Sequence, residues 1–267
     1  MEVHVAVIKK ELLQFDWKSL LISCADQADD IARHYYNKVD LSITEKEDKS
    51  VVSEGDIEIE KHIRSYIASH CPSLEIYGEE FGACDRHAPY KLIIDPIDGT
   101  SNFVRKIPVF GTLLGIEIDG QVIAGLVSNP IMNDRWVALR DKGATYNDEP
   151  IQVSSIQSLN NAQGFYGSLY GREARGHTDQ LLKLLSKTKR QRGIGDFLMH
   201  MWVANGYGEF GIDFNLQPWD LAPLGIIVEE AGGVVTATSG DSFDIYEGSI
   251  LSSNGCFHND IVSVYQS

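Results

Sequence analysis

Apolar side chains recur at helical spacing in two segments near the start of the chain. The first segment runs from Glu11 to about Tyr36, and the second follows Ser53 and runs to about Ser69. Ser53 is a favourable N-cap, and Asp56 falls in the first turn, where the helix dipole favours a negative charge. The polar stretch over 45–50 between the segments has the composition of a surface loop. The pattern therefore predicts two amphipathic helices joined by a polar loop.

Short apolar runs bounded by turn residues predict strands over the next part of the chain. These runs cover residues 74–77, 91–94, 110–118, 121–128, 135–139 and 145–146. Asp119-Gly120 between two of them is a strong signal for a two-residue hairpin turn. Residues 1–150 are thus expected to form helices packed on an antiparallel sheet.

After Ile151 the pattern changes to alternating strands and helices. Strands are predicted over 164–168, 191–194, 209–214, 234–236 and 249–252, and helices over 177–186, 196–205, 219–231 and 257–264. Residues 151–267 are thus expected to form an α/β layer. No repeat or long linker separates the two halves, so we expect them to share one interface.

Charge, cysteine content and apolar segments restrict the binding partners and the cellular location expected for this protein. The 267 residues carry a formal net charge of −15, which argues against nucleic acid and anionic membranes as partners. The four cysteines show no metal-binding spacing and are expected to be reduced thiols. The N-terminal apolar stretch is too short for a signal peptide, and no segment reaches the length of a spanning helix. A cytoplasmic protein that does not enter the membrane is expected.

The most informative motif follows the apolar run over 91–94. It is Asp95-Pro96-Ile97-Asp98-Gly99-Thr100. Two carboxylates beside a glycine with accessible backbone amides provide what a divalent cation and a phosphate group need at one place. Taken alone, the motif is better explained as an acidic β-turn at the end of a strand.

Three further acidic positions fit the same site. Glu79 follows the predicted strand over 74–77, Asp220 opens a helix after Pro218, and Asp56 lies in the first turn of the second helix. Each has an ordinary alternative: a solvated charge for Glu79, a helix-start residue for Asp220, and a cap for Asp56. Each alternative is favoured for its position taken singly, but it is much less expected that all of them hold in one chain.

Together these motifs resemble the inositol monophosphatase superfamily of metal-dependent phosphomonoesterases. The matching segments, in family order and over nearly the whole chain, are residues 52–56, 78–80, 95–100 with Asn102-Phe103, 219–222 and 230–233. The resemblance implies a five-layered α-β-α-β-α sandwich with the site at the junction of the two halves. It also implies a homodimer and inhibition by lithium.

Carried over by position, the resemblance implies two to three Mg²⁺ ions. Glu79, Asp95 and the carbonyl of Ile97 would hold the first ion. Asp95, Asp98 and Asp220 would hold the second, and a weaker third would lie near Glu79 and Asp56. Hard oxygen ligands of this kind fit Mg²⁺ better than zinc.

The same resemblance implies the remaining roles. The amides of Gly99 and Thr100 would bind phosphate oxygens, and the Thr100 hydroxyl would orient the attacking water with Glu79. Lys46 corresponds best to the lysine of the family's mobile loop, with Lys49 as a nearby rival. The chain departs from the usual pattern without losing a predicted metal ligand: the departures are Ser53 for threonine, Asp213 for glutamate and Pro223 for alanine.

The substrate depends on residues outside the metal ligands. Residues 102–105 with Pro108, and Gly195-Asp196-Phe197, resemble the histidinol-phosphate phosphatase branch. Asp196 and Asp213 would place two carboxylates near the leaving group, which suits a cationic amino alcohol and predicts L-histidinol phosphate as substrate. Alternatively, Asp196 only caps the helix that begins there. Glu209 either adds to this acidic wall or is exposed on its strand.

Other functions are also compatible with parts of the pattern. Inositol-1-phosphate is the second candidate substrate. Fructose-1,6-bisphosphate and adenosine 3′,5′-bisphosphate are less expected, because an acidic pocket repels a second phosphate. A non-catalytic protein that binds metal or a phosphometabolite and regulates a partner would be indicated by a lost metal carboxylate or a missing Thr100, and the sequence keeps both.

Overall fold

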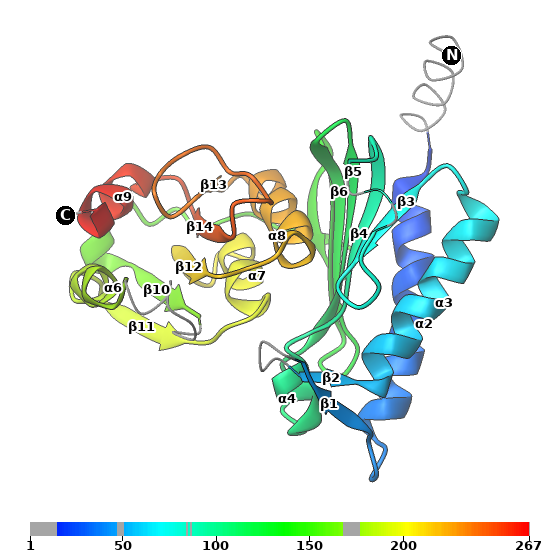
Figure 1. Ribbon diagram of the computed structural model, residues 1–267. Helices are drawn as coiled ribbons and strands as arrows, with labels where there is room; N and C mark the ends of the chain where they lie inside the picture. The colour runs from blue at the N-terminus through cyan, green and yellow to red at the C-terminus, as the bar shows by residue number, and fades with distance from the viewer. Residues whose placement is uncertain (1–14, 47–50, 84, 86, 168–176, 267) are drawn as a thin grey trace.

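Two β-sheets and three layers of helices alternate through the molecule (Figure 1). The computed structural model describes residues 15–46, 51–83, 85, 87–167 and 177–266. Several expectations fall outside these residues: the rival lysine Lys49, most of the polar loop over 45–50, the first residues of the first predicted helix, and Ser168.

The outer helical layer consists of α2 (Trp17–Tyr36) and α3 (Glu54–His70). The Asp16 side chain caps α2 through the backbone N–H of Ser19. Ser53 caps α3 as predicted, and Asp56 completes a capping box. A short antiparallel pair, β1 (Ile43–Glu45) with β2 (Val51–Ser53), flanks the expected polar loop over 45–50 and was not predicted. Its strands are three residues long and partly exposed, so they leave no alternating apolar pattern.

The larger sheet has seven strands in chain order. They are β3 (Glu75–Gly78), β4 (Tyr90–Asp98), β5 (Gly111–Ile118), β6 (Gln121–Asn129), β7 (Asp134–Leu139), β8 (Gly143–Tyr146) and β9 (Glu149–Pro150). All neighbours pair antiparallel except β3 and β4, which run parallel. The expectation of a wholly antiparallel sheet is therefore wrong at this edge, because the chain after β3 returns along the strand before β4 begins. The Asp119-Gly120 hairpin forms as predicted.

The smaller sheet has five strands in the order β11-β10-β12-β14-β13. They are β10 (Gln163–Tyr166), β11 (Arg190–Gly193), β12 (Phe210–Phe214), β13 (Val234–Thr236) and β14 (Ser249–Ser253). β10 runs parallel to both of its neighbours, and β14 runs antiparallel to both of its own. The sheet is thus mixed.

Four helices accompany the smaller sheet. α6 (Thr178–Leu185) and α9 (His258–Gln266) lie on its outer side, and α7 (Leu198–Ala204) and α8 (Pro218–Glu230) lie between the two sheets (Figure 1). Two short elements complete the described chain: α4 (Thr100–Val104) after β4, and a 3₁₀ turn (Leu159–Asn161) before β10.

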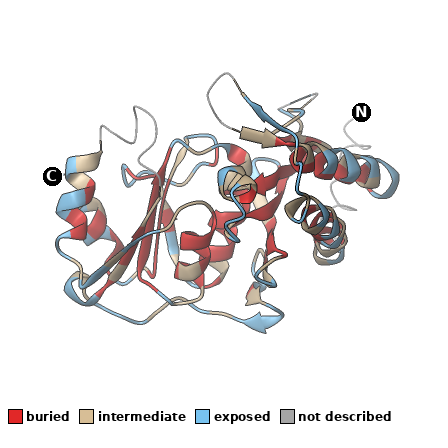
Figure 2. Ribbon diagram, turned by 90° about the horizontal axis from the view of Figure 1, so that it is seen from below, coloured by how far each residue is buried: buried red, intermediate tan, exposed pale blue. Residues whose placement is uncertain are grey.

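Three hydrophobic clusters fill the spaces between the layers. One joins α2 and α3 to the larger sheet, the second surrounds α7 and α8 between the sheets, and the third joins the smaller sheet to α6 and α9. Figure 2 shows burial concentrated in the central strands and in the helices between the sheets. The expected five-layered α-β-α-β-α sandwich is therefore confirmed, whereas the division of the chain at residue 150 stays a prediction. Within the described residues, no helix has both the length and the hydropathy to cross a bilayer.

Candidate active site

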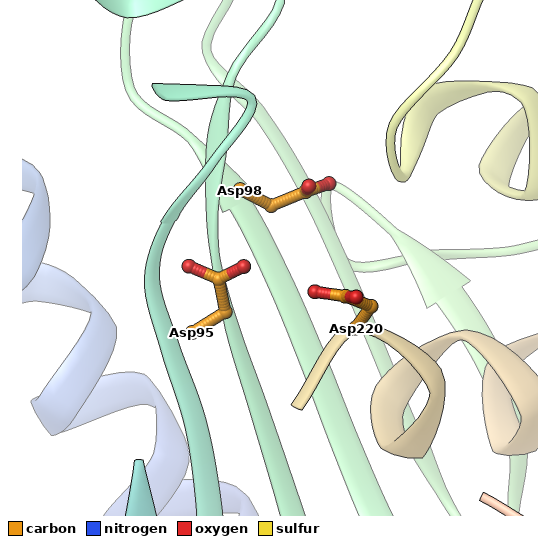
Figure 3. A group of neighbouring side chains, drawn as sticks. All are labelled: Asp95, Asp98 and Asp220. Atoms are coloured by element: carbon orange, nitrogen blue, oxygen red, sulfur yellow. The ribbon is translucent and has the colours of Figure 1, made fainter. Parts of the chain in front are cut away.

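Three aspartates from two distant parts of the chain meet beside the larger sheet. Asp95 and Asp98 lie on β4, and Asp220 lies in the first turn of α8. One carboxylate oxygen from each lies within 4.8 Å of the others. Figure 3 shows the three side chains pointing toward one another. The structure thus brings together the carboxylates assigned to the second metal ion.

An irregularity in β4 explains why Asp95 and Asp98 share this region. The predicted strand over 91–94 continues to Asp98, and its pairing with β5 shifts between Asp95, opposite Leu113, and Asp98, opposite Gly111. The distance from Asp95 to Asp98 is three residues along β4 but only two along β5. β4 therefore carries one extra residue here and forms a β-bulge. Side chains three apart on a regular strand point to opposite faces. The bulge cancels this alternation and turns both carboxylates toward α8.

Asp220 is fixed by the beginning of α8. The backbone N–H of Gln217, the N-cap residue, donates to Oδ2 of Asp220 at 2.7 Å, and Pro218 occupies the first helical position. Burial, together with a smaller effect of the nearby Glu79 carboxylate, raises the pKa of Asp220 to about 7 although the Gln217 bond lowers it. One oxygen is thus held by the helix terminus, while the other is available to the cluster.

Burial and mutual repulsion make the cluster costly without a cation. Burial, and then the neighbouring carboxylates beginning with Glu79, raise the pKa of Asp95 well above its usual range. Burial, and then Asp196 and Asp220, do the same for Asp98. Closely spaced, desolvated carboxylates are stabilised by a multivalent cation. An all-oxygen set of this kind fits a hard divalent ion.

Thr100 links the turn after β4 to α3. Its hydroxyl lies 3.2 Å from Oδ1 of Asp56 and 2.9 Å from the carbonyl oxygen of Ile97. Asp56 in turn accepts the backbone N–H and the hydroxyl of Ser53 at 2.9 and 2.6 Å. Burial raises the pKa of Asp56 to about 6 although the Ser53 bonds lower it. Gly99, at φ +80°, allows the sharp change of direction that starts α4 at Thr100.

Glu79 and Lys46 meet at the edge of the cluster. Nζ of Lys46 lies 2.8 Å from Oε1 of Glu79 and 2.9 Å from Oε1 of Glu80. Sequence reasoning included Glu80 only as part of the Gly78-Glu79-Glu80 motif and gave it no role. The structure shows the Glu80 side chain almost fully buried, and burial raises its pKa to about 7. In the sequence, only the adjacency of the two glutamates indicated that Glu80 could belong to the site.

Asp196 is not a helix cap. α7 begins at Leu198 with Phe197 in the N-cap position and without a side-chain cap. Asp196 has φ +55°, which is outside the helical region, and its Oδ2 accepts a hydrogen bond from the Asn102 amide at 2.7 Å. The predicted helix over 196–205 therefore starts two residues later. Burial raises the pKa of Asp196 to about 6, and the Asn102 bond lowers it.

Asp213 and Glu209 lie toward opposite ends of β12. Asp213 is buried, and burial raises its pKa to about 8, with a smaller increase from Asp196 and Asp220. Glu209 is also buried, and it accepts the Ser154 hydroxyl and the Gln163 backbone N–H at 2.7 and 2.6 Å. The expectation that Glu209 is exposed on its strand is therefore wrong, and the acidic wall gains no support, because the carboxylate fixes the start of β10.

Comparison with known proteins agrees with this geometry. The sequence profile of the inositol monophosphatase family matches residues 15–266. The chain belongs to this family. Its members act on phosphate esters with the help of metal ions, and this chain is accordingly a metal-dependent phosphomonoesterase with an acidic metal-binding cluster of Asp95, Asp98 and Asp220. Family membership and the intact cluster decide against the non-catalytic alternative.

Individual relatives differ in the substrate that their names state. A histidinol-phosphatase of Streptomyces coelicolor is 36% identical over 247 residues, which cover 89% of this chain and 92% of that protein. A fructose-1,6-bisphosphatase/inositol-1-monophosphatase of Thermotoga maritima is 35% identical over 220 residues, covering 81% and 82%. Among solved structures, the extragenic suppressor protein suhB of Bartonella henselae superposes with a TM-score of 0.88 at 26% identity, covering 94% and 98%. Overall identity alone thus leaves the substrate open.

Proposed function

We propose that this protein hydrolyses L-histidinol phosphate in a reaction that depends on Mg²⁺. The observation that carries the proposal is the placement of Asp196. Its Oδ2 lies 3.3 Å from the position that a Cβ on Gly99 would occupy, and the Asn102 amide holds it there. A carboxylate is therefore fixed against the turn whose amides are expected to bind phosphate.

Asp196 and the buried Asp213, whose carboxylates are close enough to repel each other, favour a cationic leaving group. Burial raises the pKa of Asp196 to about 6 and that of Asp213 to about 8, so both are costly to ionise without a positive partner. The amino group of histidinol phosphate supplies this partner, whereas the ring of inositol phosphate is neutral. Opposite charges attract strongly in a partly desolvated site. The histidinol-phosphatase of Streptomyces coelicolor supports the same substrate.

Residues around the Gly99–Thr100 turn account for phosphate binding and for activation of the attacking water. The backbone N–H groups of Gly99 and Thr100, at the start of α4, bind the phosphate oxygens. The Thr100 hydroxyl, oriented by Asp56, holds the attacking water together with Glu79. Glu79, the Ile97 carbonyl and the three aspartates would hold two to three Mg²⁺ ions, which when bound would supply neutralisation of the phosphate charge and a lower pKa of water. Lys46, paired with Glu79 and Glu80, joins its loop to this edge of the site.

Inositol-1-phosphate is the second candidate, and the Thermotoga maritima relative favours it. The proposed test is phosphate release by the purified protein on both esters, with and without Mg²⁺, compared as kcat/KM. A preference of at least about tenfold for histidinol phosphate, equivalent to about 1.4 kcal/mol, is expected. Equal rates or a preference for inositol phosphate would contradict the role of Asp196 while preserving the metal chemistry.

Three further expectations stay predictions. The resemblance gives a homodimer and inhibition by lithium, and the composition and the apolar pattern, not the resemblance, give a cytoplasmic location. Light scattering in solution and phosphate release against increasing LiCl would test the first two directly, and fractionation of the source cells would test the third.

A further inference from the structure

The turn that carries Glu79 is built around the carboxylate of Glu60. Glu60 lies on α3 and is completely buried. Its Oε2 accepts the backbone N–H of Glu80 at 2.9 Å, and its Oε1 accepts the N–H of Phe81 at 3.3 Å. A buried side chain on another element therefore holds the two amides that directly follow Glu79.

Arg64 completes this arrangement from the next turn of α3. Its Nε and Nη2 donate to Oε1 of Glu60 at 2.9 and 2.7 Å, and Nη2 also donates to the carbonyl of Gly82. The guanidinium thus holds the far end of the turn and neutralises the buried carboxylate. Arg64 and Glu60 together act as a clamp on residues 78–82 that adds no net charge to the acidic cluster.

The backbone of the turn is adapted to this clamp. A Cβ on Gly78 would lie only 2.1 Å from Oε1 of Glu60, so a side chain there would displace the carboxylate. Gly78 and Gly82 bond to each other through both backbone pairs at 3.2 and 3.0 Å. The N–H of Glu79 donates to the carbonyl of Ile94, which directly precedes Asp95, at 3.2 Å. Glu79 is therefore held between the clamp on one side and β4 on the other.

We infer that Glu60 is a positioning residue for the metal centre, which fixes the turn 78–82 so that the Glu79 carboxylate faces Asp95. The inference rests on the proposed role of Glu79 as a metal ligand. Fixing a ligand before the ion arrives removes part of the ordering cost of binding, so the clamp raises metal affinity. Glu60 touches neither substrate nor ion, and its effect is expected in Mg²⁺ binding rather than in the chemical step.

The first test is Mg²⁺ binding to the full-length Glu60→Gln protein, measured by calorimetry without substrate. The amide keeps the size of the side chain but places an NH₂ donor against N–H donors. We expect the Kd for Mg²⁺ to rise at least about tenfold, the range seen when partners of metal ligands are lost. kcat at saturating Mg²⁺ should stay within about threefold of the wild type. An unchanged Kd in the folded variant would overturn the inference.

A matched control separates positioning from general stability. Asp29→Asn removes another buried carboxylate. Asp29 lies on α2 and pairs with Arg135 of β7 at 2.7 Å, and among the described residues it contacts none of the proposed metal ligands. Its thermal midpoint should fall while its Kd for Mg²⁺ stays unchanged. If Glu60→Gln behaves in the same way, Glu60 stabilises the fold only.

Two more variants complete the test. Arg64→Lys keeps the positive charge but loses the forked contact, and we expect a weaker rise in the Mg²⁺ Kd of about threefold or more. This variant decides the question if Glu60→Gln does not fold. Glu79→Gln should weaken Mg²⁺ binding directly. An unchanged Kd for Mg²⁺ in Glu79→Gln would contradict both the proposed role of Glu79 as a ligand and the inference about Glu60. A Kd that rises in Glu79→Gln but not in Glu60→Gln or Arg64→Lys would contradict the inference alone.

Discussion

The backbone N–H of Phe197 donates to Oδ2 of Asp98 at 2.7 Å. This bond joins the N-cap residue of α7 to the end of β4, so one oxygen of a predicted metal ligand is held by the C-terminal half of the chain. Asp196, immediately before Phe197, adopts φ +55° and is bonded to Asn102. The C-terminal strands and helices therefore supply Asp220 and also set the orientation of Asp98.

Replacing Asp95 should separate metal binding from folding. We expect Asp95→Asn to lower kcat at least about a thousandfold, or about 4 kcal/mol, because Asp95 is common to both principal metal positions. Without metal the variant should be at least as stable as the wild type at pH 7, because burial and repulsion raise the pKa of Asp95 in the native cluster. Phosphate-release kinetics and thermal unfolding with and without Mg²⁺ measure both effects.

Mg²⁺ itself provides the control for this experiment. It should raise the unfolding temperature of the wild type, because an ion that binds only the folded state stabilises it. The unfolding temperature of Asp95→Asn should not respond to the same concentration. Mg²⁺-dependent turnover in a folded Asp95→Asn protein would exclude Asp95 as an essential ligand.

The acidic pair near the leaving group should determine selectivity. Asp196→Asn keeps an acceptor for Asn102 but removes the charge, and Asp213→Asn removes the second charge. We expect each to lower kcat/KM for histidinol phosphate about tenfold to a hundredfold, since a hydrogen bond to a charged group contributes about 1.5–3 kcal/mol. Inositol-1-phosphate should be affected by less than about threefold. Side-by-side kinetics on the two esters measure the ratio.

Glu209→Gln is the matched control for this pair, because Glu209 is buried near the start of β12 and its carboxylate fixes β10. It should reduce stability while leaving the ratio of the two kcat/KM values unchanged. The acidic-pocket proposal fails if Asp196→Asn and Asp213→Asn also leave that ratio unchanged.

His200 should make the protein sensitive to acid. This α7 residue is fully buried, bonds Ser252 through Nδ1 at 2.8 Å, and has no partner for Nε2 within the described part of the chain. Burial lowers the pKa of His200 to about 3 from 6.5. Between these pH values the unfolded state takes up a proton that the folded state does not. This term therefore lowers the free energy of unfolding as the pH falls below 6.5.

The size of the effect follows from the pH interval. From pH 6.5 to 4.5 the His200 term amounts to at most about 2.7 kcal/mol. His200→Gln should lose that much less stability on acidification than the wild type, as measured by urea unfolding at pH 7 and 4.5. Equal acid responses of His200→Gln and the wild type would mean that His200 is protonated in the fold.

Glu230 should contribute far more to stability than its neighbour Glu229. Its carboxylate accepts the backbone N–H groups of Asp141, Lys142 and Gly143 at 2.9, 3.2 and 2.8 Å, which fixes the turn between β7 and β8 against the end of α8. Glu229 instead forms a partly exposed ion pair with Arg140 at 2.7 Å. Glu230→Gln should lower the free energy of unfolding by about 1–3 kcal/mol. Glu229→Gln should cost less than about 1 kcal/mol. Urea unfolding that gives equal costs would contradict this difference.

Local signals predicted the elements whose boundaries depend on neighbouring residues. Ser53 and Asp56 form the predicted start of α3, because a capping box involves residues only three apart. The Asp119-Gly120 hairpin formed for the same reason. The start of α7 was misplaced by two residues, because the contact that draws Asp196 out of the helix comes from Asn102, 94 positions earlier.

The sequence by itself determined the family and the acidic residues, because their identity and order are written directly in the motifs. Tertiary structure alone decided how these residues meet. The β-bulge that turns Asp95 and Asp98 to one face depends on pairing with β5, and the clamp that Glu60 forms around residues 78–82 depends on α3 packing against β4. Strand register and side-chain burial arise only when distant segments pack together, so no local pattern specifies them.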